Sequence, residues 1–249
     1  MDPYAWSWNP EGLVVLGATG AYLAAIRGRT APAWRIACFL AGMLLLLAVS
    51  VTPIHTLGMH YLLTVHLLQN VVLAEWAPLL LVLGVPPGLA ARLTRPRVVR
   101  FLTRPYVALP LWVGTYALWH VPALYDAALR HPSSLLALEH ATYVVSGALF
   151  WWCVWQDVPH RLSSIARTGY VLAAFVLSAP LGLVLALVPR PLYDFYAAAP
   201  ERVWGLSRLE DQQLGGMTMA GEQSIVFFAV FAYWFARFLA EQEQVEEVA

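Results

Sequence analysis

Apolar residues fall into seven long runs, separated by short polar connections that contain prolines and arginines. About 20 consecutive apolar residues let a helix cross the hydrocarbon core of a bilayer. The pattern therefore predicts an all-α, polytopic membrane protein in which one domain, residues 1–249, contains seven transmembrane helices. The runs cover residues 12–27, 35–54, 61–84, 106–122, 135–155, 168–188 and 213–239.

Composition supports this class and excludes others. Hydrophobic residues make up 60% of the chain and charged residues 12%, and the mean hydropathy is +0.62. These values lie well outside the range of soluble globular domains. All basic residues are arginines and the formal net charge is zero, so no overall field attracts a polyanion such as nucleic acid.

The placement of the arginines predicts the orientation, because positive residues in short loops stay on the cytoplasmic side. One side holds Arg27, Arg29, Arg35, Arg92, Arg95, Arg97, Arg100, Arg104, Arg161, Arg167 and Arg237. The other side is left with Arg130, Arg190, Arg202 and Arg208. We therefore predict an external N-terminus and a cytoplasmic C-terminus. The arginines at 92–104 also offer charge to anionic lipid headgroups.

The third apolar run contains four polar residues that hydrocarbon disfavours. His66, Gln69 and Asn70 stand at positions i, i+3 and i+4 and therefore form one stripe of a helix. Glu75 lies off that stripe, which assigns it to a different contact. Ionisable residues within membrane helices cost about 2.5–3.5 kcal/mol each on insertion scales and generally mark functional sites.

Three further helices place unusual residues at the same predicted depth, in the outer leaflet. His120 ends the fourth run, and Glu139 and His140 begin the fifth. The first turns of the seventh run contain Met217, Met219, Glu222 and Gln223. A single such histidine is more often a helix-packing group, but three histidines on three helices favour a shared site. Glu139 points about 100° away from His140 and is better explained as a hydrogen-bonding group between helices.

Imidazole and thioether are ligands that copper accepts, and methionine favours Cu(I). Zinc rarely uses methionine, whereas a haem would accept two histidines or a histidine and a methionine as axial ligands. No serine or cysteine shares this layer with a histidine and a carboxylate, so we predict no enzymatic activity of the nucleophilic kind. The residues by themselves predict an outer-leaflet metal or haem site.

Two other groups of residues can be explained by a position at the membrane interface or in the core. His55 and His60 occupy the predicted outer loop with Met59, either as interfacial residues or as a capture site for a metal. The aromatic residues of "PLYDFYAAAP" and "FWW" are typical of interface belts and core packing.

The stretches "HLLQN…PLLLVLG", "LWHVPALYDAAL", "LEH", "FWW", "LYDFYA" and "DQQLGGMTM" occur in this order between the third and the seventh helix. This ordered set resembles the CtaG-type cytochrome c oxidase assembly factors. The resemblance implies a multi-pass protein of the bacterial plasma membrane that handles copper during maturation of haem-copper oxidases. It also implies oxidase subunits, extracytoplasmic copper chaperones and membrane lipid as partners.

Carried over onto this sequence, the resemblance implies that His66, His120 and His140 bind the metal, with Met219 or Met217 as a thioether ligand. It also implies a polar pair, Asp211 and Gln212, at the mouth of the last helix, and a role for Tyr125 and Asp126 after the W-H-x-P turn. The residues themselves add Gln69, Asn70, Glu139 and Glu222 as further polar candidates around the site. Asn70 departs from the family pattern, which commonly has a second histidine there. Asparagine is a poor copper ligand, so Gln69 and Asn70 are expected to orient an imidazole.

We therefore expect a non-enzymatic assembly factor that holds copper in a shallow intramembrane site and passes it to an oxidase subunit. The alternatives are a copper transporter, a haem-binding membrane protein, and a structural oxidase partner whose histidines only pack helices.

Overall fold

The structure is a computed structural model that describes residues 2–28, 30–199 and 203–248, with the side chains through residue 246. Every regular element within these ranges is a helix, which confirms the all-α prediction. Arg29 and Arg202, used above to predict the orientation, lie outside the described residues.

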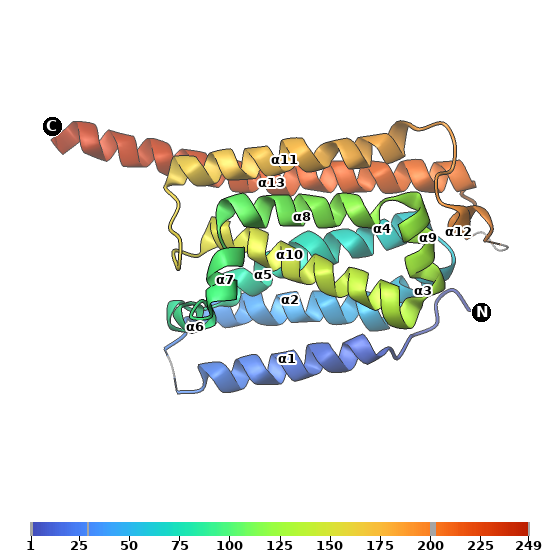
Figure 1. Ribbon diagram of the computed structural model, residues 1–249, viewed down its shortest axis with the longest axis horizontal. Helices are drawn as coiled ribbons and strands as arrows, with labels where there is room; N and C mark the ends of the chain where they lie inside the picture. The colour runs from blue at the N-terminus through green and yellow to red at the C-terminus, as the bar shows by residue number, and fades with distance from the viewer. Residues whose placement is uncertain (1, 29, 200–202, 249) are drawn as a thin grey trace.

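The long helices run side by side along the molecule (Figure 1). They are α1 (Pro10–Ile26), α2 (Ala33–Val51), α4 (Leu63–Val71) with α5 (Ala77–Gly84), α8 (Pro105–Trp119), α10 (Ala137–Trp155), α11 (Ser164–Leu187) and α13 (Arg208–Val248). A π-helical turn, η1 (Val72–Trp76), joins α4 to α5, and a second one, η2 (Pro132–Leu136), precedes α10. The short helices are α3 (Pro53–His60), α6 (Pro87–Leu93), α7 (Arg97–Leu102), α9 (Pro122–Arg130) and α12 (Asp194–Ala197).

Four stretches within the described residues are long and apolar enough to cross a bilayer: Ala33–Val51, Leu63–Gly84, Ser164–Leu187 and Arg208–Glu246. A fifth span exists if α8 and α9, which meet at a 74° bend, count as one. The protein is thus a multi-pass membrane protein by helix length and composition, while the seven-span topology stays a prediction.

The helix predicted at residues 106–122 ends earlier in the structure than expected. Residues before a proline are biased away from the helical conformation, and α8 ends at Trp119, three residues before Pro122. Pro122 then begins α9, where its missing N–H costs no helical hydrogen bond. This break turns the chain by 74° and places His120 in the corner.

Close packing of the spanning helices depends on small residues. A Cβ atom added to Gly182 of α11 would lie 2.9 Å from the Ala220 nitrogen and 3.0 Å from the Gly216 oxygen, both on α13. Small residues let membrane helices approach closely and gain dispersion contacts. Aromatic rings fill the centre, where Trp112 stacks on Phe150 with centroids 4.7 Å apart.

The two ends of the bundle differ in their short elements. Helices α3, α9 and α12 lie at the end that holds the N-terminus, and α6 and α7 lie at the end from which α13 projects (Figure 1). The termini therefore lie at opposite ends of the molecule. The arginine-rich helices share an end with the C-terminus, as the orientation prediction requires.

Cysteine labelling tests that orientation. In a background with Cys38 and Cys153 replaced by alanine, we expect Ser133→Cys to react with a membrane-impermeant maleimide in intact cells. Arg95→Cys should react only after the membrane is permeabilised, because the arginine-rich end is predicted to face the cytoplasm. The opposite pattern would invert the topology.

Candidate functional site

The structure brings the three predicted histidines together at the N-terminal end of the bundle. His66 belongs to α4, His120 follows the last residue of α8, and His140 belongs to α10. The ring centroids of His66 and His140 are 6.5 Å apart. Tyr125 connects His66 to His120, with centroid distances of 5.4 Å and 5.8 Å. Four helices were predicted to place unusual residues in one layer, and the three helices that carry histidine do so.

In two of these histidines, one ring nitrogen bonds to an acceptor elsewhere in the protein. The Nδ1–H group of His120 donates to the Tyr116 carbonyl oxygen at 2.8 Å. Nδ1 of His140 lies 3.0 Å from both carboxylate oxygens of Glu11. Because both acceptors require a proton on Nδ1, each imidazole is left with an unprotonated Nε2 when it is neutral.

The remaining nitrogens are buried and have no hydrogen-bond partner within the described part of the chain. They are Nε2 of His120, Nε2 of His140 and both ring nitrogens of His66, whose side chain is 0% exposed. An unsatisfied buried polar group costs about 1–3 kcal/mol. Imidazoles that bind metals have this arrangement, with one nitrogen bonded to a carbonyl or carboxylate and the other directed to the ion.

Glu11 is a site residue that the sequence analysis missed. It lies in the first turn of α1, where Asn9 caps the helix by accepting the Glu11 N–H at 2.7 Å. The side chain then reaches His140, which is 129 residues away in the chain. A lone carboxylate at the start of an apolar run was the available signal, but nothing in the spacing relates it to α10.

His55 is also close to the site. It lies on α3, outside the candidate spans, and its Nδ1 is buried without a partner among the described residues. Burial, together with the nearby His140, lowers the pKa of His55 to about 4, so its imidazole is neutral at pH 7. His60 ends the same helix and is exposed.

Tyrosines form the wall of the site. Tyr125 stacks on Tyr193 with centroids 4.0 Å apart, and the Tyr193 hydroxyl donates to the His120 carbonyl oxygen at 3.2 Å. Tyr196 of α12 donates to the Gly58 carbonyl oxygen of α3. Tyr193, which precedes α12, and Tyr196 are both buried, so they pack around the site and do not form an interface belt.

Asn70 and Glu139 bond to each other. Asn70 Nδ2 donates to Glu139 Oε1 at 3.3 Å, which confirms that Glu139 links two helices. Gln69 Nε2 donates to the Val49 carbonyl oxygen of α2 at 2.8 Å. These amides lie one turn from His66 and fix α4 against α10 and α2.

The two methionines predicted as possible ligands differ in burial. Met219 is buried at 1% exposure, whereas Met217 is 56% exposed. Residues two apart on an α-helix differ by about 200° in direction, so they cannot face the same site. The expectation that Met217 lies beside the histidines is wrong, because its side of α13 faces away from the bundle.

Glu222 belongs to a second polar cluster, next to η1. Its Oε2 accepts the Trp76 Nε1–H at 2.6 Å, and Gln223 Nε2 donates to Glu75 Oε1 at 2.7 Å. Glu75 and Trp76 lie about 14–15 Å along the helix from His66 at 1.5 Å per residue. The prediction that Glu222 assists the histidine layer is therefore wrong, while the separate contact expected for Glu75 is found.

Asp211 and Gln212 bind backbone groups. Asp211 accepts the N–H groups of Leu63 and Thr64 at 2.9 Å each and so caps α4. Gln212 accepts the Leu192 N–H at 2.6 Å and donates to the Arg190 carbonyl oxygen at 3.1 Å. These contacts position the start of the helix that carries His66 and the loop before α12.

Within residues 2–28, 30–199 and 203–248, no group of three or more His, Cys, Asp or Glu side chains is arranged to hold a metal ion. The three-nitrogen site is thus not preformed. His66 and His140 come nearest to a two-nitrogen site. Metal–nitrogen bonds of about 2 Å would place the centroids of two opposed imidazoles about 6 Å apart, close to the 6.5 Å observed.

Comparison with known proteins gives a family match and three distant relatives. A family model described as cytochrome c oxidase caa3 assembly factor matches residues 18–241. The uncharacterized protein ML1998 of Mycobacterium leprae is 25% identical over 83% of this chain. The uncharacterized proteins Mb0105 of Mycobacterium bovis and MT0111 of Mycobacterium tuberculosis are each 26% identical over 82% of it. The chain spans about a third of these relatives, 34–35% of their length, and no solved structure matches.

The capping role of Asp211 predicts a stability effect. Asp211→Ala should lower the free energy of unfolding by about 1–3 kcal/mol, because the Leu63 and Thr64 N–H groups lose their acceptor. Thermal unfolding in detergent measures the change. Glu243→Ala, which removes an exposed carboxylate from the same helix, is the control and should change stability by less than about 0.5 kcal/mol. Equal effects would contradict the assigned role.

Proposed function

The chain belongs to the cytochrome c oxidase caa3 assembly factor family, and we propose that it serves oxidase assembly by binding copper at the histidine layer. Copper is cargo here. It is taken up at the His66, His120 and His140 imidazoles and then transferred to a haem-copper oxidase subunit in the bacterial plasma membrane.

The observation that carries this proposal is the set of four buried ring nitrogens without partners at one end of the bundle. Neutral imidazole nitrogens are good donors to copper and need no proton loss on binding. A purely structural layer of histidines would be expected to satisfy these nitrogens, since each one left unpaired costs stability.

Glu11 orders one member of a pair of imidazole ligands. Glu11 holds the His140 ring with Nε2 directed away from the carboxylate, and the His66 ring centroid lies 6.5 Å from that of His140. Glu11 is also an anion beside a site for a cation. With two imidazoles in reach, transfer by ligand exchange is easier than from a closed four-ligand cage.

The short helices mark the side from which cargo arrives. His55 and exposed His60 on α3 lie at the same end as the histidine layer, so they extend the set of imidazoles toward the surface. In the predicted orientation this is the external face, where an extracytoplasmic copper chaperone would dock. No specific observation favours the transporter or the haem-binding alternative.

Copper loading tests the proposal. Purified protein loaded with Cu(I) should retain about one copper per chain, bound by imidazole. The double variant His66→Ala/His140→Ala should lose it. Metal content by mass spectrometry is the measurement, and Met217→Ala should keep wild-type copper because that side chain faces away from the site.

The matched control removes two histidines from outside the layer. His131→Ala/His160→Ala takes away the exposed imidazole of His131 and the half-buried imidazole of His160 and should leave copper content unchanged. Copper lost equally from both double variants, or from neither, would refute the intramembrane site. The link to assembly is then tested by purifying the oxidase from cells that carry each variant and measuring its copper content.

Glu11 gives a second prediction. Removing the partner of a metal-ligating histidine typically costs 10–100-fold in affinity, so Glu11→Ala should weaken Cu(I) binding by about that factor. Glu11→Gln should have a smaller effect, because the amide oxygen still accepts the His140 Nδ1–H. Competition with a chromophoric Cu(I) chelator measures both. Asp2→Ala is the control, and an equal loss there would contradict the role of Glu11.

A further inference from the structure

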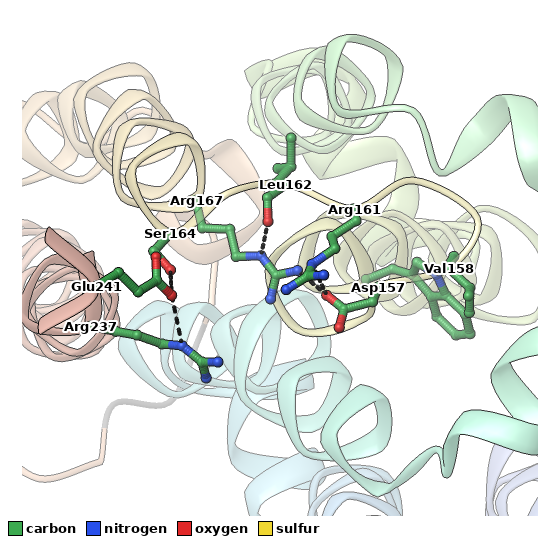
Figure 2. Close-up of polar contacts among 9 residues, drawn as sticks. Asp157, Val158, Arg161, Leu162, Ser164, Arg167, Arg237 and Glu241 are labelled. Carbon is green, nitrogen blue, oxygen red and sulfur yellow. Dashed lines mark hydrogen bonds and ion pairs between the residues drawn. The ribbon is translucent and has the colours of Figure 1, made fainter. Parts of the chain in front are cut away.

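A polar cavity of about 560 Å³ lies at the opposite end of the bundle from the histidines. It is enclosed by the first turns of α2 and α11, the last turn of α10, the 156–163 connection and the part of α13 near Trp234. None of its residues takes part in the proposed handling of copper. Figure 2 shows the contacts of Asp157, Arg161, Ser164, Arg167, Arg237 and Glu241 in this cavity.

Positive charge dominates the lining. Four arginines face two carboxylates, which leaves a formal charge of +2 in a cavity between membrane helices: Arg35, Arg161, Arg167 and Arg237 against Asp157 and Glu241. The N-terminus of α11 adds the positive end of its helix dipole, with Ser163 as the capping residue.

The arginines are held in place by their neighbours. Arg167 is buried, pairs with Asp157 and donates to the Leu162 carbonyl oxygen at 3.1 Å. Its guanidinium also lies 4.4 Å from the centre of the Trp234 ring. Ser164 and Arg237 both bond to Glu241, at 2.7 Å and 3.3 Å (Figure 2). The cavity is therefore an ordered set of donors.

Two guanidinium groups remain available to a ligand. The Arg161 side chain is 76% exposed and lies 3.9 Å from Asp157, and the Arg237 side chain is 52% exposed. Guanidinium groups bind phosphate oxygens through paired N–H donors. The net formal charge of +2 in the lining matches one or two phosphodiesters.

The rim of the cavity is aromatic. Trp34 and Tyr233 line it and are 52% and 48% exposed on apolar helices, and Trp155 also belongs to the lining. Tryptophan and tyrosine are enriched where a bilayer meets water. A ligand that enters here comes from the headgroup region.

We propose that this cavity binds a phosphate-bearing anion, supplied as the headgroup of an anionic phospholipid. Basic pockets between helix ends bind such headgroups in other membrane proteins. In the predicted orientation the cavity faces the cytoplasmic leaflet, where anionic lipid is concentrated.

The test compares lipid binding by wild type, Arg161→Gln/Arg237→Gln and Arg190→Gln/Arg208→Gln. Both double variants remove two exposed arginines, so net charge changes equally, but Arg190 and Arg208 lie outside the cavity. Native mass spectrometry with phosphatidylglycerol or phosphatidylcholine measures affinity. Wild type should prefer phosphatidylglycerol, Arg161→Gln/Arg237→Gln should bind it roughly tenfold to thirtyfold more weakly, and the control should stay within about twofold.

Glycerol 3-phosphate separates the two sources of phosphate. It should compete only at concentrations far above those of phosphatidylglycerol, and binding as tight as the lipid's would overturn the lipid assignment. Equal binding of the two lipids by wild type, or an equal loss in the control, would overturn the site. Unchanged melting of Arg161→Gln/Arg237→Gln in phosphatidylcholine shows that the variant is folded.

Discussion

Backbone and side-chain polar groups inside a bilayer have no water to bond, so the bundle must satisfy them itself. This constraint explains most of the buried polar residues. Asp211 caps α4, Gln212 bonds the loop before α12, and Gln69 donates to the Val49 carbonyl oxygen of α2. Gln156 donates to the Val82 carbonyl oxygen at 2.8 Å where α5 ends. Each of these residues supplies a hydrogen bond where the helical backbone pattern ends or where two helices meet.

The buried histidine nitrogens that lack a hydrogen-bond partner among the described residues form a cluster, and other single atoms, such as the Tyr125 hydroxyl and Trp151 Nε1, also lack one. Asp126 shows what a structural role looks like in the same region, because both of its oxygens accept N–H groups of α12. His66 contributes two buried nitrogens, and neither has an acceptor or donor among the described residues. A neighbour could have supplied one, as Glu11 does for His140. Leaving the set open costs stability, and the proposed binding of copper would offset that cost.

The sequence predicts well how deep a residue lies in the membrane, but poorly whether its side chain faces the bundle. Hydropathy and the 1.5 Å rise per residue place His66, His120 and His140 in one layer without any tertiary information. Whether a residue faces the bundle depends on small differences in angle, which is why Met217 was placed at the site and Glu222 in the wrong cluster. Glu11 could not be found from spacing, since its contact joins the first and fifth predicted helices and depends on how α1 packs.

The two proposed sites are physically independent. Helix α11 has 24 residues and is therefore about 36 Å long, which is roughly the distance between the layer near α12 and the cavity at its first turn. The two sites share no residue, and the aromatic stack of Trp112, Phe150 and Phe227 lies in the centre of the bundle. Loss of lipid binding should therefore leave copper affinity intact, so either proposal can fail alone. A coupling between them would require movement of α13, which contacts α4 near the histidines and carries Arg237 at the cavity.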